Sequence, residues 1–114
     1  MKQFEALFNS SKQGMYLYLD DEHCGCNAAL AKMTGYKSAD EWAKVGRGDF
    51  MKYVDPKSQK LLVDTYQKAM KEGVGAQIPV TWVRKDGKTA ASSTILVPYP
   101  FEGHRFALHF ISPS

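Results

Sequence analysis

The chain has 114 residues, of which 44% are hydrophobic and 24% are charged, and its formal net charge at pH 7 is +3. This length suits one domain with one core, and no run approaches the roughly 18 apolar residues that a membrane-spanning helix needs. The basic residues are scattered and lack interleaved aromatic neighbours, which argues against nucleic-acid binding. No signal peptide is recognisable at the start, so a cytoplasmic location is the default expectation.

The N-terminal segment predicts a helix followed by a strand. Phe4, Leu7 and Phe8 recur at helical spacing, which indicates an amphipathic helix over 3–9. The aromatic and long apolar residues over 15–19 indicate the first strand. Because the helix is amphipathic, we expect it to cover an apolar surface elsewhere in the domain.

A polar turn and a second short strand come next. The acidic stretch 20–22 is expected to be a solvated turn, because one short acidic cluster lacks the ligand spread that a hard cation needs. Cys24 and Cys26 share one face of the strand predicted over 23–26. Their spacing suits neither a zinc site nor an ordinary disulfide, so we predict no metal site and two free cysteines in a reducing compartment.

Three helix starts follow, each with a capping residue. Asn27 is a favourable N-cap for a short helix, and Ser38 opens a capping box for the next one. Asp55 followed by Pro56 opens the strongest helix of the chain, which is predicted to end at Gly73.

The C-terminal third predicts three strands, over 77–83, 89–97 and 105–111. The stretch 85–88 holds an Asp-Gly pair, which favours a tight hairpin turn, and the Pro- and Gly-rich stretch 98–103 predicts a second turn. Strands joined by short turns are antiparallel neighbours. With the N-terminal hairpin, the expected fold class is α+β, a five-stranded antiparallel sheet with helices packed on one face and a short N-terminal helix.

Several segments in this order resemble those of a known family. They are Gly14 to Asp20, Asn27 to Ala29, Met33 to Tyr36, Asp55 with Pro56, and Arg84 to Lys88. Together they resemble the first strand, the Asn-capped helix ending in Gly-Tyr, the start of the long helix and the hairpin turn of PAS domains. The resemblance runs from about Phe4 to Ile111, although Asp55 stands where many PAS domains carry a histidine.

This resemblance implies a sensory domain of a signalling protein. We expect one PAS domain over 1–114, with a cap helix in 1–12 and a core in 13–114, excised from a larger two-component protein such as a histidine kinase. Such a domain binds a small ligand or a protein partner and relays the change to an output domain. The sequence has no Gly-rich phosphate loop, serine elbow or paired histidines at metal-ligand spacing, so we predict no catalytic site and no enzyme activity.

The resemblance also bears on cofactors. Heme-binding members carry a histidine on the long helix, whereas 55–72 contains none, and His109 is predicted to point away from the pocket. Photoactive flavin-binding members carry a cysteine in the stretch that corresponds to 45–53, where this chain has none. Trp82 and Phe110 are aligned with the Asn and Gln of flavin-binding members. These differences argue against heme and covalent flavin.

Strand alternation predicts a concave site between the sheet and the helices, apolar with a few polar groups. Its candidate ligand-pocket residues are Ile78, Val80, Trp82, Ser92, Thr94, Leu96, Phe106, Leu108 and Phe110. The alternative is that the large rings fill this space as core and leave little or no cavity.

The opposite face of the sheet is expected to be apolar and available for contact. Candidate residues for a dimer or cap interface are Phe4, Leu7, Phe8, Ala107, His109 and Ile111. Either the N-terminal helix covers this face or two chains pack there as a homodimer. Two further functions stay open beside the sensor: a ligand-free scaffold for protein contacts, and a small α+β enzyme with an acid or base inside its cavity.

Overall fold

The computed structural model describes residues 2–20 and 22–113, with side chains for 6–20, 22–100 and 102–113. The elements in chain order are α1 (Lys2–Ser10), β1 (Gly14–Asp20), β2 (His23–Cys26), α2 (Ala28–Met33), α3 (Ala39–Val45), the 3-10 helix η1 (Phe50–Tyr53), α4 (Pro56–Glu72), β3 (Ala76–Val83), β4 (Thr89–Phe101) and β5 (His104–Pro113). The predicted order of helices and strands is confirmed.

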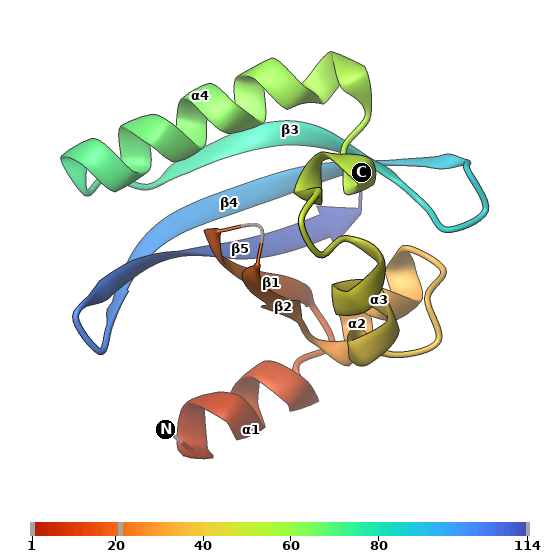
Figure 1. Cartoon of the computed structure of the whole chain (residues 1–114), viewed down its shortest axis with the longest axis horizontal. Coiled ribbons are helices and arrows are strands. Elements are labelled where there is room, and N and C mark those ends of the chain that lie inside the picture. Colours follow the sequence, from red (N-terminus) through yellow and green to blue (C-terminus); the bar gives the residue numbers. More distant parts are fainter. Residues whose placement is uncertain (1, 21, 114) are drawn as a thin grey trace.

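The strands form one antiparallel five-stranded sheet in the order β2-β1-β5-β4-β3. The sheet is curved; α4 crosses one face, α2 and α3 lie at one end, and α1 lies on the other side (Figure 1). The N-terminal hairpin therefore joins the sheet beside the last strand, as expected, and the α+β class is confirmed. No helix within 2–20 and 22–113 is long and apolar enough to cross a membrane.

Asn27 connects three elements at the start of α2. Its Oδ1 accepts from the backbone N–H of Leu30 at 3.0 Å and from that of Met15 at 3.1 Å. Its Nδ2 donates to the carbonyls of Phe8 at 3.0 Å and Gln13 at 2.9 Å. The predicted N-cap is confirmed, and the same side chain holds α1 and β1 against α2.

The other two caps are confirmed as well. Ser38 Oγ accepts from the N–H of Glu41 at 3.1 Å, and the Glu41 carboxylate reaches back to the N–H of Lys37 at 2.9 Å. Asp55 Oδ1 accepts from the N–H of Lys57 at 3.0 Å at the start of α4. These contacts satisfy backbone donors that a helix leaves free in its first turn.

The hairpin between β4 and β5 is longer than predicted. The stretch 98–103 was expected to be a turn, whereas β4 continues to Phe101 and only Glu102 and Gly103 turn, both with positive φ. Beyond Leu96, β4 has no β3 partner, because Ala76 opposite it is the first residue of β3. Pro98 and Pro100, which have no backbone N–H to donate, therefore lie in the part of β4 where no β3 neighbour needs a donor.

The main correction to the sequence-based prediction concerns which side chains of β5 face the helices. Tyr16 of β1 pairs with His109, and Thr94 of β4 pairs with Ile111, so these residues face the helices. Ala107, His109 and Ile111 are buried at 0%, 2% and 0% exposure and do not form an outer interface. Phe106, Leu108 and Phe110 occupy the alternate positions on the outer face and do not line a pocket beneath the helices.

The physical reason is that both faces of β5 are apolar, so hydrophobicity alone does not fix which face is inside. Tyr16, Tyr18 and Phe50 already fill the inner space with large rings. The strand opposite them contributes thin groups: Ala107 lies opposite Tyr18, and the flat ring of His109 stacks on Tyr16. Alternating large and small side chains across facing positions is how a core reaches native density.

Candidate functional site

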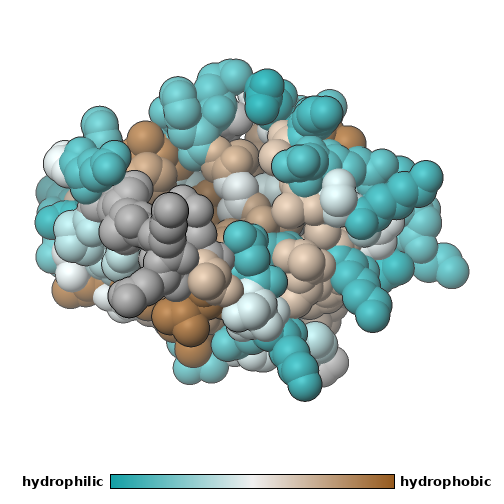
Figure 2. Space-filling model, turned by 90° about the horizontal axis from the view of Figure 1, so that it is seen from below, coloured by the Kyte–Doolittle hydropathy of each residue, from teal (hydrophilic) through white to brown (hydrophobic). Residues whose placement is uncertain are grey.

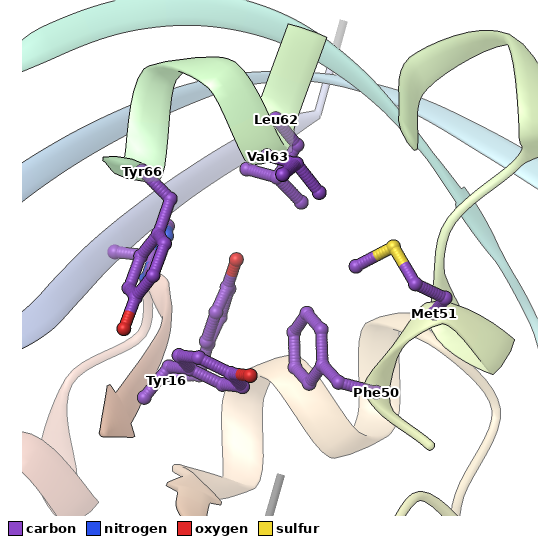
Figure 3. Close-up of a pocket in the computed structure, with 8 residues that line it drawn as sticks. Tyr16, Phe50, Met51, Leu62, Val63 and Tyr66 are labelled. Atoms are coloured by element: carbon purple, nitrogen blue, oxygen red, sulfur yellow. The ribbon is translucent and has the colours of Figure 1, made fainter. Parts of the chain in front are cut away.

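A cavity of about 50 Å³ lies between the inner face of the sheet and α4. Side chains from β1, β5, η1 and α4 surround it (Figure 3). Its lining residues are Tyr16, Tyr18, Phe50, Met51, Leu62, Val63, Tyr66 and His109. The volume matches one or two waters at roughly 30 Å³ each and is about a third of a cavity that takes benzene.

Hydrogen bonds fix both ends of α4 above this cavity. At its start, Asp55 N–H donates to the carbonyl of Thr81 at 2.9 Å, and Thr81 N–H donates to Ser58 Oγ at 2.9 Å. At its end, Arg105 Nη1 donates to the carbonyl of Met70 at 2.7 Å. The helix is thereby tied to β3 at one end and to β5 at the other.

Tyr66 holds the middle of α4 to β1. Its hydroxyl donates to the carbonyl of Leu19 at 3.2 Å, and its ring meets that of Tyr18 edge-on at a centroid distance of 5.3 Å. Because Tyr66 also lines the cavity, this hydrogen bond holds one wall of the cavity in place against β1.

Tyr16 lies at the centre of the aromatic core. Its ring stacks on His109 at 3.8 Å and meets the edge of Trp82 at 5.5 Å between centroids. The side chain is 0% exposed, and its hydroxyl is the one buried side-chain polar atom, among the described residues, without a hydrogen-bond partner. Burial raises the pKa of Tyr16 well above its usual value, with smaller contributions from Cys24 and Tyr18. The phenol therefore stays protonated with an unused donor beside a cavity.

His109 is the second polar group of the cavity. Its Nδ1 lies 3.1 Å from the carbonyl of Ala107, which makes Nδ1 the protonated nitrogen. Burial lowers the pKa of His109 to about 3, against the opposing effect of hydrogen bonds to the backbone of Ala107 and Tyr16. The ring is therefore neutral near pH 7. The prediction that His109 points away from the pocket was wrong.

Six predicted pocket residues do lie buried on the inner face, and they pack beside the cavity instead of lining it. They are Ile78, Val80, Trp82, Ser92, Thr94 and Leu96. Trp82 Nε1 donates to Ser92 Oγ at 2.8 Å, and the Ser92 hydroxyl donates to the carbonyl of Val80 at 2.7 Å. These polar groups satisfy one another within the core. As ligand contacts, the six residues remain a prediction.

Sequence reasoning missed the residues that line the cavity, although part of the signal was available. Tyr16 and Tyr18 alternate along β1, so both had to face the same side of the sheet. Leu62 and Tyr66 lie four residues apart on α4 and so form part of one apolar stripe along the helix. No sequence pattern indicates that η1 packs against this stripe, so Phe50 could not be recognised as a lining residue from the sequence.

The cofactor expectations can be compared with this geometry. Ligand pockets for molecules of drug size measure about 300–1,000 Å³, several times the present cavity, so a heme or a flavin would require a far larger displacement of α4 than a small ligand does. Phe110, which the sequence aligned with the flavin-binding Gln, lies on the outer face of β5 and does not line this cavity.

The outer face carries a separate groove of about 220 Å³, lined by Phe8 of α1, Leu17, Phe106 and the short strand β2. Leu7 is 72% exposed and Ile95 is 41% exposed. Figure 2, seen from the side on which α1 lies, shows apolar residues between hydrophilic rims. The side chain of Phe4 lies outside the described residues.

In the described part of the chain, no group of three or more His, Cys, Asp or Glu side chains could hold a metal ion. Cys24 and Cys26 carry reduced thiols, and burial raises the pKa of Cys26 to about 12. A thiol with this pKa is protonated at neutral pH and is a poor nucleophile.

Comparison with known proteins identifies the fold. No family model and no curated protein matches the chain. A PAS domain from a two-component sensor histidine kinase aligns over 99% of this chain and 95% of its own, with a TM-score of 0.75 and 13% identity. The PAS domain of a protein from Colwellia psychrerythraea covers 99% and 95%, with a TM-score of 0.79 and 16% identity. The LOV protein of Rhodobacter sphaeroides covers 98% and 66%, with a TM-score of 0.75 and 19% identity. The chain has the PAS fold, and the resemblance drawn from the sequence is confirmed.

Proposed function

We propose that this chain is a sensory PAS domain that receives a small ligand in the cavity between β1, β5 and α4. The observation that carries the proposal is that Tyr16, whose side chain lines that cavity, has a buried hydroxyl with no hydrogen-bond partner among the described residues. A buried donor without a partner costs about 1–3 kcal/mol, so it persists where another pressure maintains it. The PAS fold shared with a domain of a sensor histidine kinase supports the same function.

The ionisation of the cavity favours binding over catalysis. A general base works best when its pKa lies near the working pH. The pKa of His109 is about 3, so its ring is a weak base, while burial keeps Tyr16 from giving up its proton. None of the lining side chains in the described part of the chain is a carboxylate. A cavity enzyme of the isomerase kind therefore has less support than a binding site.

Displacement of α4 is the proposed first step of signalling. A ligand of more than a few heavy atoms exceeds 50 Å³ and must push Leu62 and Val63 away from the sheet. This movement breaks the bond between Tyr66 and Leu19 and strains the tie between Arg105 and the end of α4. Since Arg105 lies on β5, the change reaches the strand that leads to the C-terminus, and from there an output domain.

A sensory role also implies that this domain is part of a larger signalling protein. Residues 1–12 act as a cap and 13–114 as the PAS core, within a larger cytoplasmic signalling protein such as a histidine kinase. A ligand-free scaffold or homodimer is the second candidate, and the exposed Leu7 and Ile95 on the outer side of the sheet favour it.

A methyl-labelled NMR screen of small uncharged metabolites tests the proposal. We expect binders to shift the methyl signals of Met51, Leu62 and Val63, whereas the exposed Leu61 on the same helix serves as an internal reference. Shifts confined to the outer side of the sheet would contradict the cavity and favour the scaffold.

A matched pair of variants separates cavity binding from general effects on α4. Val63→Phe places a ring in the cavity and is expected to abolish binding. Leu61→Phe adds a similar ring on the exposed side of the same turn and is expected to leave binding unchanged. Equal loss in both variants would show that the cavity is not the binding site.

A further inference from the structure

The chemistry of the cavity restricts the charge of its ligand. Among the described residues that line it, no side chain is charged at neutral pH, since the polar groups are tyrosine hydroxyls and one neutral imidazole. A buried charge without a partner is destabilised by far more than a neutral group. An uncharged ligand is therefore favoured over a charged one.

The hydrogen-bonding groups restrict it further. Tyr66 already donates to Leu19, and Nδ1 of His109 is engaged with Ala107, whereas the Tyr16 hydroxyl has a donor to offer. A buried water typically makes about three hydrogen bonds. The Tyr16 hydroxyl offers one donor and Nε2 of the neutral His109 ring offers one acceptor, which is fewer partners than a buried water typically has and suits a mainly apolar molecule with an acceptor for Tyr16.

We propose that the ligand is an uncharged, mainly apolar molecule carrying one carbonyl-type acceptor, and that the Tyr16 hydroxyl donates a hydrogen bond to this acceptor. The inference rests on the proposed function of the cavity and adds the ligand class. The acceptor would lie about 2.5–3.0 Å from Tyr16 Oη, the usual range for such a bond. The apolar remainder would contact Leu62 and Val63, which face the sheet from α4 (Figure 3).

Two probes of nearly the same shape isolate the acceptor. Cyclopentanone carries a carbonyl oxygen where methylenecyclopentane carries a CH₂ group, and both are uncharged. Their dissociation constants are measured by methyl NMR titration at Met51, Leu62 and Val63 in the native chain and in Tyr16→Phe. The variant removes only a hydroxyl without a partner, so it is expected to fold like the native chain.

The dissociation constant of the alkene divided by that of the ketone is expected to be roughly threefold to tenfold larger in the native chain than in Tyr16→Phe. This factor corresponds to one neutral hydrogen bond. The infrared carbonyl band of bound cyclopentanone gives a second readout. It is expected at lower frequency in the native chain than in Tyr16→Phe, because donation from Tyr16 weakens the C=O bond. Cyclopentanecarboxylate, as a charged probe, is expected to leave the cavity methyls unchanged.

The outcomes distinguish this inference from the proposed function. If both probes shift the cavity methyls with the same ratio of affinities in the two proteins, the ligand class is wrong and the cavity remains a binding site. Binding of the carboxylate in the cavity also overturns the ligand class. If no uncharged probe or metabolite moves the cavity methyls, both proposals fail.

Discussion

Replacing Tyr16 by Phe is expected to stabilise the protein, which is the reverse of the usual effect of removing a buried hydroxyl. The Tyr16 hydroxyl is fully buried and has no partner among the described residues, and such a donor costs about 1–3 kcal/mol. The ring and its stack on His109 remain in Tyr16→Phe. We expect the free energy of unfolding to rise by about 1–2 kcal/mol, and Tm to rise by about 4 °C for each kcal/mol in a chain of this size.

Urea denaturation of the ligand-free protein, followed by circular dichroism, measures this change, and Tyr53→Phe is the matched control. The Tyr53 hydroxyl donates to the carbonyl of Trp42 in the same core, so its loss is expected to lower the free energy of unfolding by about 0.5–1.5 kcal/mol. If Tyr16→Phe is destabilised to the same extent as Tyr53→Phe, then the Tyr16 hydroxyl has a partner and the argument for a ligand fails.

Three further predictions concern His109, Tyr66 and Asn27. A histidine in the unfolded chain takes up a proton near pH 6.5, whereas buried His109 takes one up only near pH 3. Between these two pH values only the unfolded chain is protonated at this residue, so the free energy of unfolding falls as the pH falls. The free energy of unfolding, measured by urea denaturation across this range, should fall by up to about 1.4 kcal/mol per pH unit. His109→Phe should remove this pH dependence, and His104→Gln, at an exposed position, should retain it. Tyr66→Phe removes the bond to Leu19 and should tighten ligand binding and speed amide exchange in α4, whereas unchanged exchange would mean that this bond does not restrain the helix. Asn27→Ala loses four hydrogen bonds and should lower the free energy of unfolding by about 2–4 kcal/mol; a loss below about 1 kcal/mol in urea denaturation would contradict its role in holding three elements together.

Local chemistry made most of the fold predictable. Asn27, Ser38 and Asp55 each cap the helix that they were expected to start, because capping depends on a few neighbouring residues. The Asp-Gly pair at 86–87 likewise turns the chain between β3 and β4. The hairpin at Glu102 was placed too early because Pro98 signals a turn locally, whereas the sheet tolerates it where β3 no longer pairs with β4.

The site depended on tertiary packing and was predicted less well. The alternation of β5 was recognised, but its two faces are similarly apolar, and only the pairing of Tyr16 with His109 decides which one meets the helices. Trp82 and Ser92 were placed on the correct face, yet they fill the core, and the space remains where Phe50 and α4 meet β1. Such a void arises from the relative positions of several elements, and no single segment of the sequence encodes it.

The sharpest single test is a crystal structure of the chain grown with the tightest ligand from the NMR screen. We expect ligand density in the cavity, with an acceptor about 2.5–3.0 Å from Tyr16 Oη and with Leu62 and Val63 moved away from the sheet. Density only in the outer groove beside Phe8 and Phe106, with the cavity still closed and the Tyr16 hydroxyl donating to a protein atom, would contradict a sensory role for this cavity.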